Sequence, residues 1–357
     1  MTILCTRFVA IPLARLLDLR PIDFFCTEND AMSNSFRSSS ALSQHPAALF
    51  GGFCVLASAV LFAIKAILIK LAYGKDPSLT GPVLLALRMA SALPFFVLIA
   101  IFAKRGAQQP TRQDWAILLV AGLMGYYLAS ILDFIGLQYI SASLERIILF
   151  LYPTLTVLLS AAIDRRPISL RTWLAIVLSY GGTVVVMLGE GTAALHANGI
   201  LYGSALVFGG AVAYALYLVM TPTLIRRFGS WRFTGLAMSV ACIASIIHAL
   251  IVTPAPFAVL AAFPSSVLIL GVALGIFSTV LPATLLMQGI ERIGAPQAAM
   301  ISAGGPILTV LLAVAFLGEH LNAVQWIGCA LNIVGVLMIT LAPKPVPAQT
   351  SHPAAET

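Results

Sequence analysis

About ten apolar stretches, each near 20 residues long, divide this chain of 357 residues and limit what it can fold into. A helix needs about 20 apolar residues to cross the hydrocarbon core of a bilayer. The links between the stretches are short, so they hold no inserted soluble domain. The sequence therefore predicts an all-α polytopic membrane protein with ten transmembrane helices. We place these at Leu49–Leu71, Pro82–Ala103, Trp115–Ile135, Leu144–Ile163, Leu170–Leu188, Ile200–Thr221, Phe233–Val252, Val267–Met287, Ala295–Phe316 and Ala323–Leu341.

Composition supports lipid as the solvent of this chain. Hydrophobic residues make up 60% of it and charged residues only 9%, whereas a soluble domain carries about 25% charged residues. The net charge of +7 lies between the apolar stretches and forms no basic run, so we expect no nucleic-acid partner. The five cysteines lack the spacing of a metal site, and we predict no disulfide, metal or cofactor.

The positive charges of the links also orient the chain. Lys and Arg gather in alternate links, such as Lys104 to Arg112, Arg165 to Arg171, and Arg226 to Arg232. Positive links face the cytoplasm. We therefore predict a multi-pass protein of the cell membrane, inner or plasma, with both termini cytoplasmic, as an even number of spans also requires.

The ends of the chain differ from its middle. Residues 1–46 form an N-terminal extension without a clean signal-peptide pattern, and Met32 opens a polar lead into the first span. Our hypothesis is that translation starts at Met32; a transit peptide is the alternative. Residues 343–357 read as a disordered cytoplasmic tail, rich in Pro and Ala.

The chain repeats itself at an offset of 153 residues, which divides it into five-helix units at 47–189 and 199–342. Matched Pro and Trp residues in one register are hard to obtain by chance among apolar helices. Because five is odd, the second unit must enter the membrane from the opposite side, as in many secondary transporters. The matches include Pro153 with Pro306, Trp173 with Trp326, and Thr156-Val157-Leu158-Leu159 with Thr309-Val310-Leu311-Leu312.

Four motifs of the second unit resemble the EamA-type members of the drug/metabolite transporter superfamily. They are Gly304-Gly305-Pro306-Ile307-Leu308-Thr309, Leu317-Gly318-Glu319-His320-Leu321, Gln325-Trp326-Ile327-Gly328 and Gly335-Val336. The resemblance implies ten helices around a central cavity and export or exchange of a small metabolite. It also implies that Glu319 ties a helix turn and is not catalytic. The first unit departs from the pattern, since Arg165-Arg166 stands where the family has Gly-Glu.

Two prolines break the fourth and ninth spans near their middles. Pro153 and Pro306 each leave a backbone carbonyl without its helical donor, and such a group must be satisfied by protein or cavity water. With Gly304 and Gly305 beside Pro306, we predict a hinge next to the substrate cavity. Kinks that serve only packing are the alternative.

Five charged residues of the first unit fall in one layer near the outer ends of four spans: Lys65, Arg88, Asp133, Glu145 and Arg146. Charges at membrane depth are typical of functional sites. Their sum of +1 favours an anionic or zwitterionic substrate such as an amino acid. The alternatives are a salt-bridge network or snorkelling to the interface. If the substrate role is right, Lys65→Ala and Arg88→Ala impair transport and leave the protein folded.

Polar and aromatic residues within other spans are further candidates for the lining of the cavity. We assign substrate binding to Tyr126, Tyr152, Tyr214 and Gln288, beside Lys65, Arg88 and Asp133. For each of these, packing is the alternative. The same reasoning adds Tyr127, Tyr217 and Asn332, and places His248 in the core or in a proton relay.

The function that these patterns favour is secondary transport of a small metabolite by alternating access, as an exporter or exchanger. An intramembrane enzyme would need a converging nucleophile, base or metal cluster, and no such motif is present. A channel would need a polar stripe along a pore, and a non-transporting regulatory protein is a further alternative. Proton antiport through Asp133 or Glu145 and simple facilitated exchange both stay open, as does the oligomeric state.

Overall fold

A computed structural model describes residues 46–340, except 105, 107, 108, 166, 190–198 and 303. The described residues form helices and no strands, and ten of these helices are long and apolar enough to cross a membrane. The predicted fold class is confirmed. The hypotheses on Met32 and the terminal tail concern residues outside the described part.

Several spans are built from consecutive helical pieces. The first five spans are α3 (Pro46–Lys75); α4 (Gly81–Phe102); α5 (Arg112–Gly122) with the π-helix η3 (Leu123–Leu128) and α6 (Ala129–Gly136); α7 (Ala142–Leu149) with α8 (Tyr152–Asp164); and α9 (Leu170–Gly189). The second five are α11 (Ile200–Phe228); α12 (Ser230–Val252); α14 (Ser265–Gly275) with the π-helix η4 (Ile276–Val280) and α15 (Leu281–Ile293); α16 (Ala295–Ser302) with α17 (Gly305–Leu317); and α18 (Ala323–Thr340). The short helix α13 (Pro256–Ala262) lies in the link before α14.

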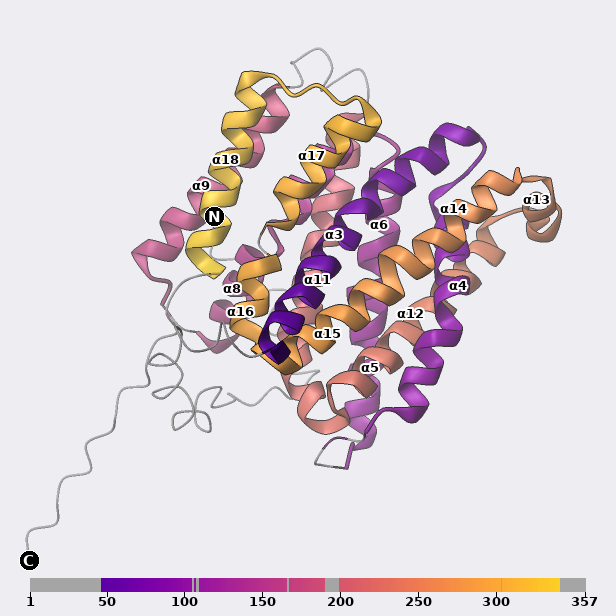
Figure 1. The fold of residues 1–357 in the computed structure, drawn as a ribbon, viewed down its shortest axis with the longest axis horizontal. Helices are drawn as coiled ribbons and strands as arrows, with labels where there is room; N and C mark the ends of the chain where they lie inside the picture. Colours follow the sequence, from indigo (N-terminus) through magenta and orange to yellow (C-terminus); the bar gives the residue numbers. More distant parts are fainter. Residues whose placement is uncertain are drawn as a thin grey trace, which may run out of the picture.

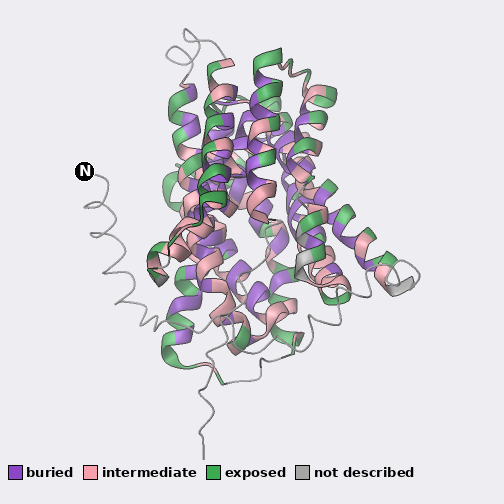
Figure 2. Ribbon diagram, turned by 90° about the vertical axis from the view of Figure 1, so that its left-hand side faces the viewer, coloured by how far each residue is buried: buried purple, intermediate pink, exposed green. Residues whose placement is uncertain are grey.

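The bundle has two ends, which we name after residues that lie there. The Lys75 end holds the turn between α3 and α4, and the Arg112 end holds the start of α5. Large apolar side chains cover the outside of the bundle between these ends, and Figure 2 shows exposed residues on the outer faces of the helices. Phe102, Leu170 and Ile251 are 80%, 76% and 77% exposed, as expected of side chains that face lipid.

Helices from different halves pack closely where a glycine leaves no side chain between their backbones. The pair α9 and α18 lies side by side at one edge of the bundle (Figure 1). A Cβ at Gly182 would lie 2.5 Å from the backbone nitrogen of Asn332, and one at Gly335 would lie 2.5 Å from that of Ser179. Small residues of this kind are the usual means of close approach in membranes.

Each of several helix pairs has a matching pair when every helix is replaced by its counterpart in the other half. Helix α3 packs against α15 and α17, and its counterpart α11 packs against α6 and α8. Likewise α4 packs against α14, and α12 against α5. The helical pieces keep the same register, since α7 and α16, η3 and η4, and α8 and α17 each begin 153 residues apart. These observations support the predicted repeat.

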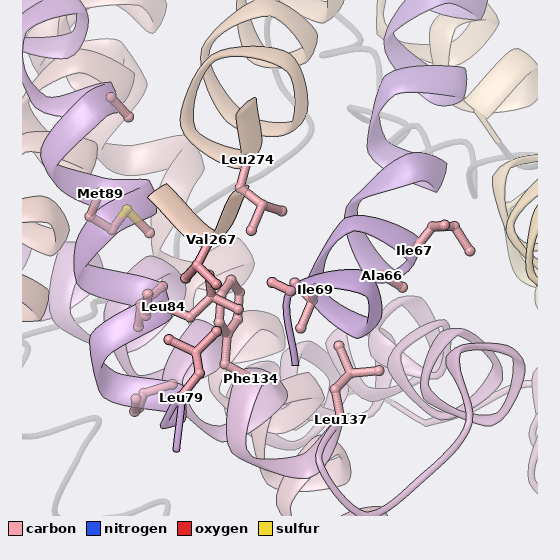
Figure 3. Close-up of a cluster of buried hydrophobic side chains, with 14 of the residues drawn as sticks. Ala66, Ile67, Ile69, Leu79, Leu84, Met89, Phe134, Leu137, Val267 and Leu274 are labelled. Atoms are coloured by element: carbon pink, nitrogen blue, oxygen red, sulfur yellow. The ribbon is translucent and has the colours of Figure 1, made fainter. Parts of the chain in front are cut away.

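A cluster of buried apolar side chains lies toward the Lys75 end. Figure 3 shows Phe134 among Leu84, Val267 and Leu79, contributed by three different spans and a link. Phe134, Leu84 and Val267 are completely buried, and Leu79 nearly so. This cluster closes the end of the bundle that lies beside the predicted charges.

Candidate functional site

A cavity of about 300 Å³ lies between the two halves of the bundle. Both halves contribute to its wall, which is mostly apolar with several charged and hydroxyl-bearing side chains. Its polar and aromatic lining consists of Phe62, Lys65, Arg88, Tyr126, Ser130, Asp133, Arg146, Phe150, Tyr152, Tyr214, Thr234, Thr279 and Ser302. A volume of this size suits a small metabolite.

The two predicted helix breaks lie beside this cavity. Pro153 and Pro306 occupy the first turns of α8 and α17, where a missing N–H costs no helical hydrogen bond. Gly304 caps α17, while Gly305 and Pro306 line the cavity. Pro153 itself does not line the cavity, but its neighbour Tyr152 does.

Two π-helical turns face the cavity at matching positions of the halves. Tyr126 lies in η3 and Thr279 lies in η4, 153 residues apart, and both side chains line the wall. The Thr279 hydroxyl donates to the Leu274 carbonyl over 2.9 Å, five residues back. π-Helical turns inside α-helices are frequent at functional sites.

Four of the five predicted charges form one chain of ion pairs. Lys65 Nζ lies 2.6 Å from Asp133 Oδ2 and 3.2 Å from Glu145 Oε1. Glu145 Oε2 lies 3.8 Å from Arg146 Nε, and Arg146 also donates to the Phe62 carbonyl over 3.1 Å. These four residues therefore form the salt-bridge network that the sequence analysis gave as an alternative. Their formal charges cancel.

Arg88 is the charge that this network leaves out. Its Nε donates to the Thr279 hydroxyl over 2.7 Å, and its guanidinium lies 5.3 Å from the centre of the Phe134 ring. Within the described part of the chain, no carboxylate oxygen lies within 4.0 Å of it, and it is 7% exposed. The net charge of +1 in the cavity thus belongs to Arg88.

Close packing places Thr279 within reach of Arg88. A Cβ on Gly275 would lie 2.5 Å from the Arg88 carbonyl oxygen, so only glycine lets α14 approach α4 at this point. Thr279 follows four residues later, on the π-helical turn. Nothing in the sequence around Thr279 marked it as a site residue, and only its 153-residue offset from Tyr126 could have found it.

Two buried carboxylate oxygens of the network, Asp133 Oδ1 and Glu145 Oε2, accept no hydrogen bond within the described part of the chain. Asp133 Oδ1 is buried and accepts no hydrogen bond from the described residues, although the side chain lines the cavity. A buried acceptor without a partner costs about 1–3 kcal/mol. Asp133 can therefore accept a hydrogen bond from a bound molecule.

Three predicted tyrosines form the aromatic side of the cavity. The rings of Tyr152 and Tyr214 lie 5.1 Å apart at nearly right angles. The Tyr126 hydroxyl lies 3.1 Å from that of Tyr217, whose ring stacks on Tyr214 at 5.7 Å. The cavity therefore has a cationic part at Arg88 and an aromatic part with hydroxyl groups.

Other sequence candidates lie away from the cavity. Gln288 does not line it. Tyr127 lies against the His248 ring at 5.8 Å, and Asn332 donates to the Ser179 carbonyl over 3.0 Å between α9 and α18. Among the described residues, no group of three or more His, Cys, Asp or Glu side chains is placed to hold a metal ion.

The chain is similar to a transporter family along nearly its whole described length. The EamA-like transporter family matches residues 49–188 and again residues 201–341. The uncharacterized transporter YcbK of Bacillus subtilis (strain 168) is 34% identical over 283 residues, which cover 78% of this chain and 89% of that protein. The uncharacterized inner membrane transporter YicL of Salmonella typhimurium is 26% identical, over 64% of this chain and 74% of that protein. A solved crystal structure matches with a TM-score of 0.54 at 20% identity, over 83% of this chain and 97% of that one, which shows the fold alone.

Proposed function

Because this chain belongs to the EamA-like transporter family and is a multi-pass membrane protein, we propose that it carries a small anionic or zwitterionic metabolite by alternating access. Amino acids are the first class to test. The proposal places the protein in the cell membrane with both termini cytoplasmic, and makes it an exporter or exchanger. The conclusion on the substrate depends on one observation, which is the unpaired Arg88 in the wall of the cavity.

Arg88 supplies the charge that an anionic group would neutralise. A guanidinium at membrane depth is costly unless it is paired, and the described residues offer it one hydroxyl and one ring. Its remaining N–H donors suit a carboxylate, which guanidinium binds with two parallel hydrogen bonds. A substrate carboxylate at Arg88 would bring the cavity to neutrality.

Asp133 extends this proposal from anions to zwitterions. Its unpartnered Oδ1 would accept a hydrogen bond from a substrate ammonium. The aromatic side of the cavity, at Tyr152 and Tyr214, would then hold the remainder of the molecule. A free amino acid has these three parts in one small molecule.

The two halves support alternating access. They meet at the cavity, and each contributes a proline-broken span and a π-helical turn. Two similar halves in opposite orientation have two nearly equivalent ways to pack, one open to each side. Rocking between them would carry the cavity from one face of the membrane to the other.

Counterflow in proteoliposomes tests this function. The purified protein is loaded with unlabelled solute, and the entry of labelled solute is followed across a panel of amino acids and organic acids. A carrier exchanges the two, whereas a channel or a non-transporting protein does not. No counterflow of any anionic or zwitterionic solute would overturn the proposal.

Arg88 variants test the substrate class. We expect Arg88→Ala to lower kcat/KM for the accepted solute by roughly 30-fold or more, since a lost charged hydrogen bond costs about 2 kcal/mol or more. Arg88→Lys should recover part of this, because a lysine keeps the charge without the planar fork. Arg171→Ala, which removes an exposed arginine at the start of α9, is the matched control and should transport normally. Normal transport by Arg88→Ala would contradict the assignment.

Proton coupling, if present, would run through the carboxylates of the network. Asp133 and Glu145 share Lys65, so protonation of one would release the lysine to the other. An imposed pH gradient that changes the native rate, but not the rate of Asp133→Asn, would support antiport. No response in the native protein would favour facilitated exchange.

A further inference from the structure

Glu319 joins the end of one core span to the start of another. Its Oε1 accepts a hydrogen bond from the Ala142 backbone N–H over 2.7 Å, and its Oε2 accepts one from the Ser143 N–H over 3.1 Å. These donors are the first two residues of α7, where the helix dipole favours a negative charge. The carboxylate reaches them because Gly318, in the left-handed conformation at φ 66°, ends α17 just before it.

The residues 153 positions away in the sequence lack groups that this contact needs. Counting back 153 residues from Glu319 gives Arg166, a cation where the acid would be. Counting forward 153 residues from Ser143 gives Pro296, which has no N–H to donate. The acceptor and one of the two donors are therefore missing from the matched positions, while Ala295, the counterpart of Ala142, keeps its N–H.

The packing of helices near Glu319 also differs from the packing of the matched helices in the exchanged halves. Helix α7 packs against α17 at the Lys75 end, whereas the exchanged pair, α8 with α16, makes at most sparse contact within the described residues. In the same way, α4 packs closely against α6, whereas their counterparts α12 and α15 meet at the Arg112 end through two side-chain hydrogen bonds, from Ser230 to Met287 and from Trp231 to Glu291. The pairs α7–α17 and α4–α6 at the Lys75 end are thus packed more closely than their counterparts at the Arg112 end.

The tie acts on the helix that carries part of the ion-pair network. Glu145 and Arg146 follow Ser143 on α7, and Lys65 of α3 binds Glu145. A carboxylate that holds the start of α7 therefore also holds the network in its closed arrangement.

We propose that Glu319 is a positioning residue that latches the Lys75 end shut, a role that Arg166, at the matched position of the sequence, lacks the carboxylate to perform. The latch rests on the proposed alternating access, since it biases the protein toward the state open at the Arg112 end. Opening the Lys75 end requires breaking two charge-assisted hydrogen bonds. With this bias, the transporter without substrate would expose its cavity at the Arg112 end.

Sided labelling of a cavity cysteine tests the latch without a known substrate. Ser130, which lines the cavity, becomes cysteine in a full chain whose five native cysteines are replaced. A membrane-impermeant methanethiosulfonate is added to vesicles of each orientation. With Glu319 present, we expect faster labelling from the side of the Arg112 end. Glu319→Gln should raise the rate from the Lys75 end by about tenfold or more.

A second variant removes a donor and keeps the acid. Ser143→Pro copies the residue at the matched position of α16, and proline is tolerated in a first helical turn. It should raise labelling from the Lys75 end, and its effect should largely disappear in the Glu319→Gln background, because the two changes remove one interaction. Additive effects would contradict the contact, and this variant decides the question if Glu319→Gln does not fold.

Transplanting the latch supplies the reverse test. Arg166→Glu with Pro296→Ala places an acid and a free N–H at the Arg112 end, and should slow labelling from that side. If neither removal nor transplantation changes the sidedness of labelling, the latch is wrong. If sidedness changes but no solute shows counterflow, the latch stands and the proposed function fails.

Discussion

The two halves of the molecule have matching helices but very different chemistry inside the membrane. The first half carries a cluster of five charged residues beside the cavity: Lys65, Arg88, Asp133, Glu145 and Arg146. The positions 153 residues later are all apolar: Leu218, Ala241, Leu286, Ala298 and Ala299. Packing contacts, in contrast, are mostly kept when the halves are exchanged. The comparison teaches that both halves share the helix packing, whereas the charges occur in one half only, which favours a role for them beyond packing.

The largest expected effect comes from breaking the charged cluster at its centre. Lys65→Leu, which copies the second half, would leave Asp133 and Glu145 buried without their shared cation. Removing one partner of a buried ion pair costs about 3–5 kcal/mol, so we expect a large loss of thermal stability in detergent. This changes the expectation from the sequence, in which Lys65→Ala left the protein folded.

Neutralising the whole network sharpens the same comparison. Lys65→Leu, Asp133→Leu, Glu145→Ala and Arg146→Ala together make the first half resemble the second, and replacing a buried ion-pair group by apolar residues is often neutral or stabilising. The quadruple variant should therefore melt near the native temperature and fail in counterflow. A quadruple variant that transports normally would show that these four charges serve stability alone.

The shared packing predicts equal costs in the two halves. Gly182→Ala and Gly335→Ala would each press a methyl group against backbone atoms, at 2.5 Å in both cases. Overpacking of this kind costs about 1–3 kcal/mol. Chemical unfolding in detergent should give similar losses for both, and Gly181→Ala, which meets nothing within 4 Å, is the control. A large loss for only one of the pair would weaken the symmetry.

The smallest expected effect concerns the caps of α8 and α17. Arg165 and Gly318 both adopt the left-handed conformation, at φ 55° and 66°, and lie 153 residues apart. A non-glycine residue in this conformation is strained by about 1 kcal/mol. Glycine removes the strain but makes the unfolded chain more flexible, which offsets part of the gain in stability. Arg165→Gly should stabilise by about 0.5 kcal/mol and Gly318→Arg should destabilise by a similar amount, both measured by thermal unfolding. Stabilisation by Gly318→Arg would contradict the cap.

Much of the fold could be predicted from local properties of the sequence. The length and apolarity of each span depend only on consecutive residues, and all ten spans are found, with ends that differ by a few residues. The breaks at Pro153 and Pro306 follow from a missing donor at one position. Among the site residues, Tyr126, Tyr152 and Tyr214 line the cavity with the charges, whereas Gln288 does not. Apolar periodicity is weak in helices surrounded by lipid, so the sequence does not say which face of each helix points inward.

The sequence by itself determined the ten spans, the repeat and the restriction of the charges to one half, because these are properties of composition and order along the chain. Only the tertiary structure decided that Lys65 joins two carboxylates while Arg88 stays unpaired, and that Glu319 reaches α7 across 177 residues of sequence. Such pairings depend on how each helix is rotated about its axis and how closely glycines let it approach its neighbours. Those quantities arise from contacts among all ten spans at once.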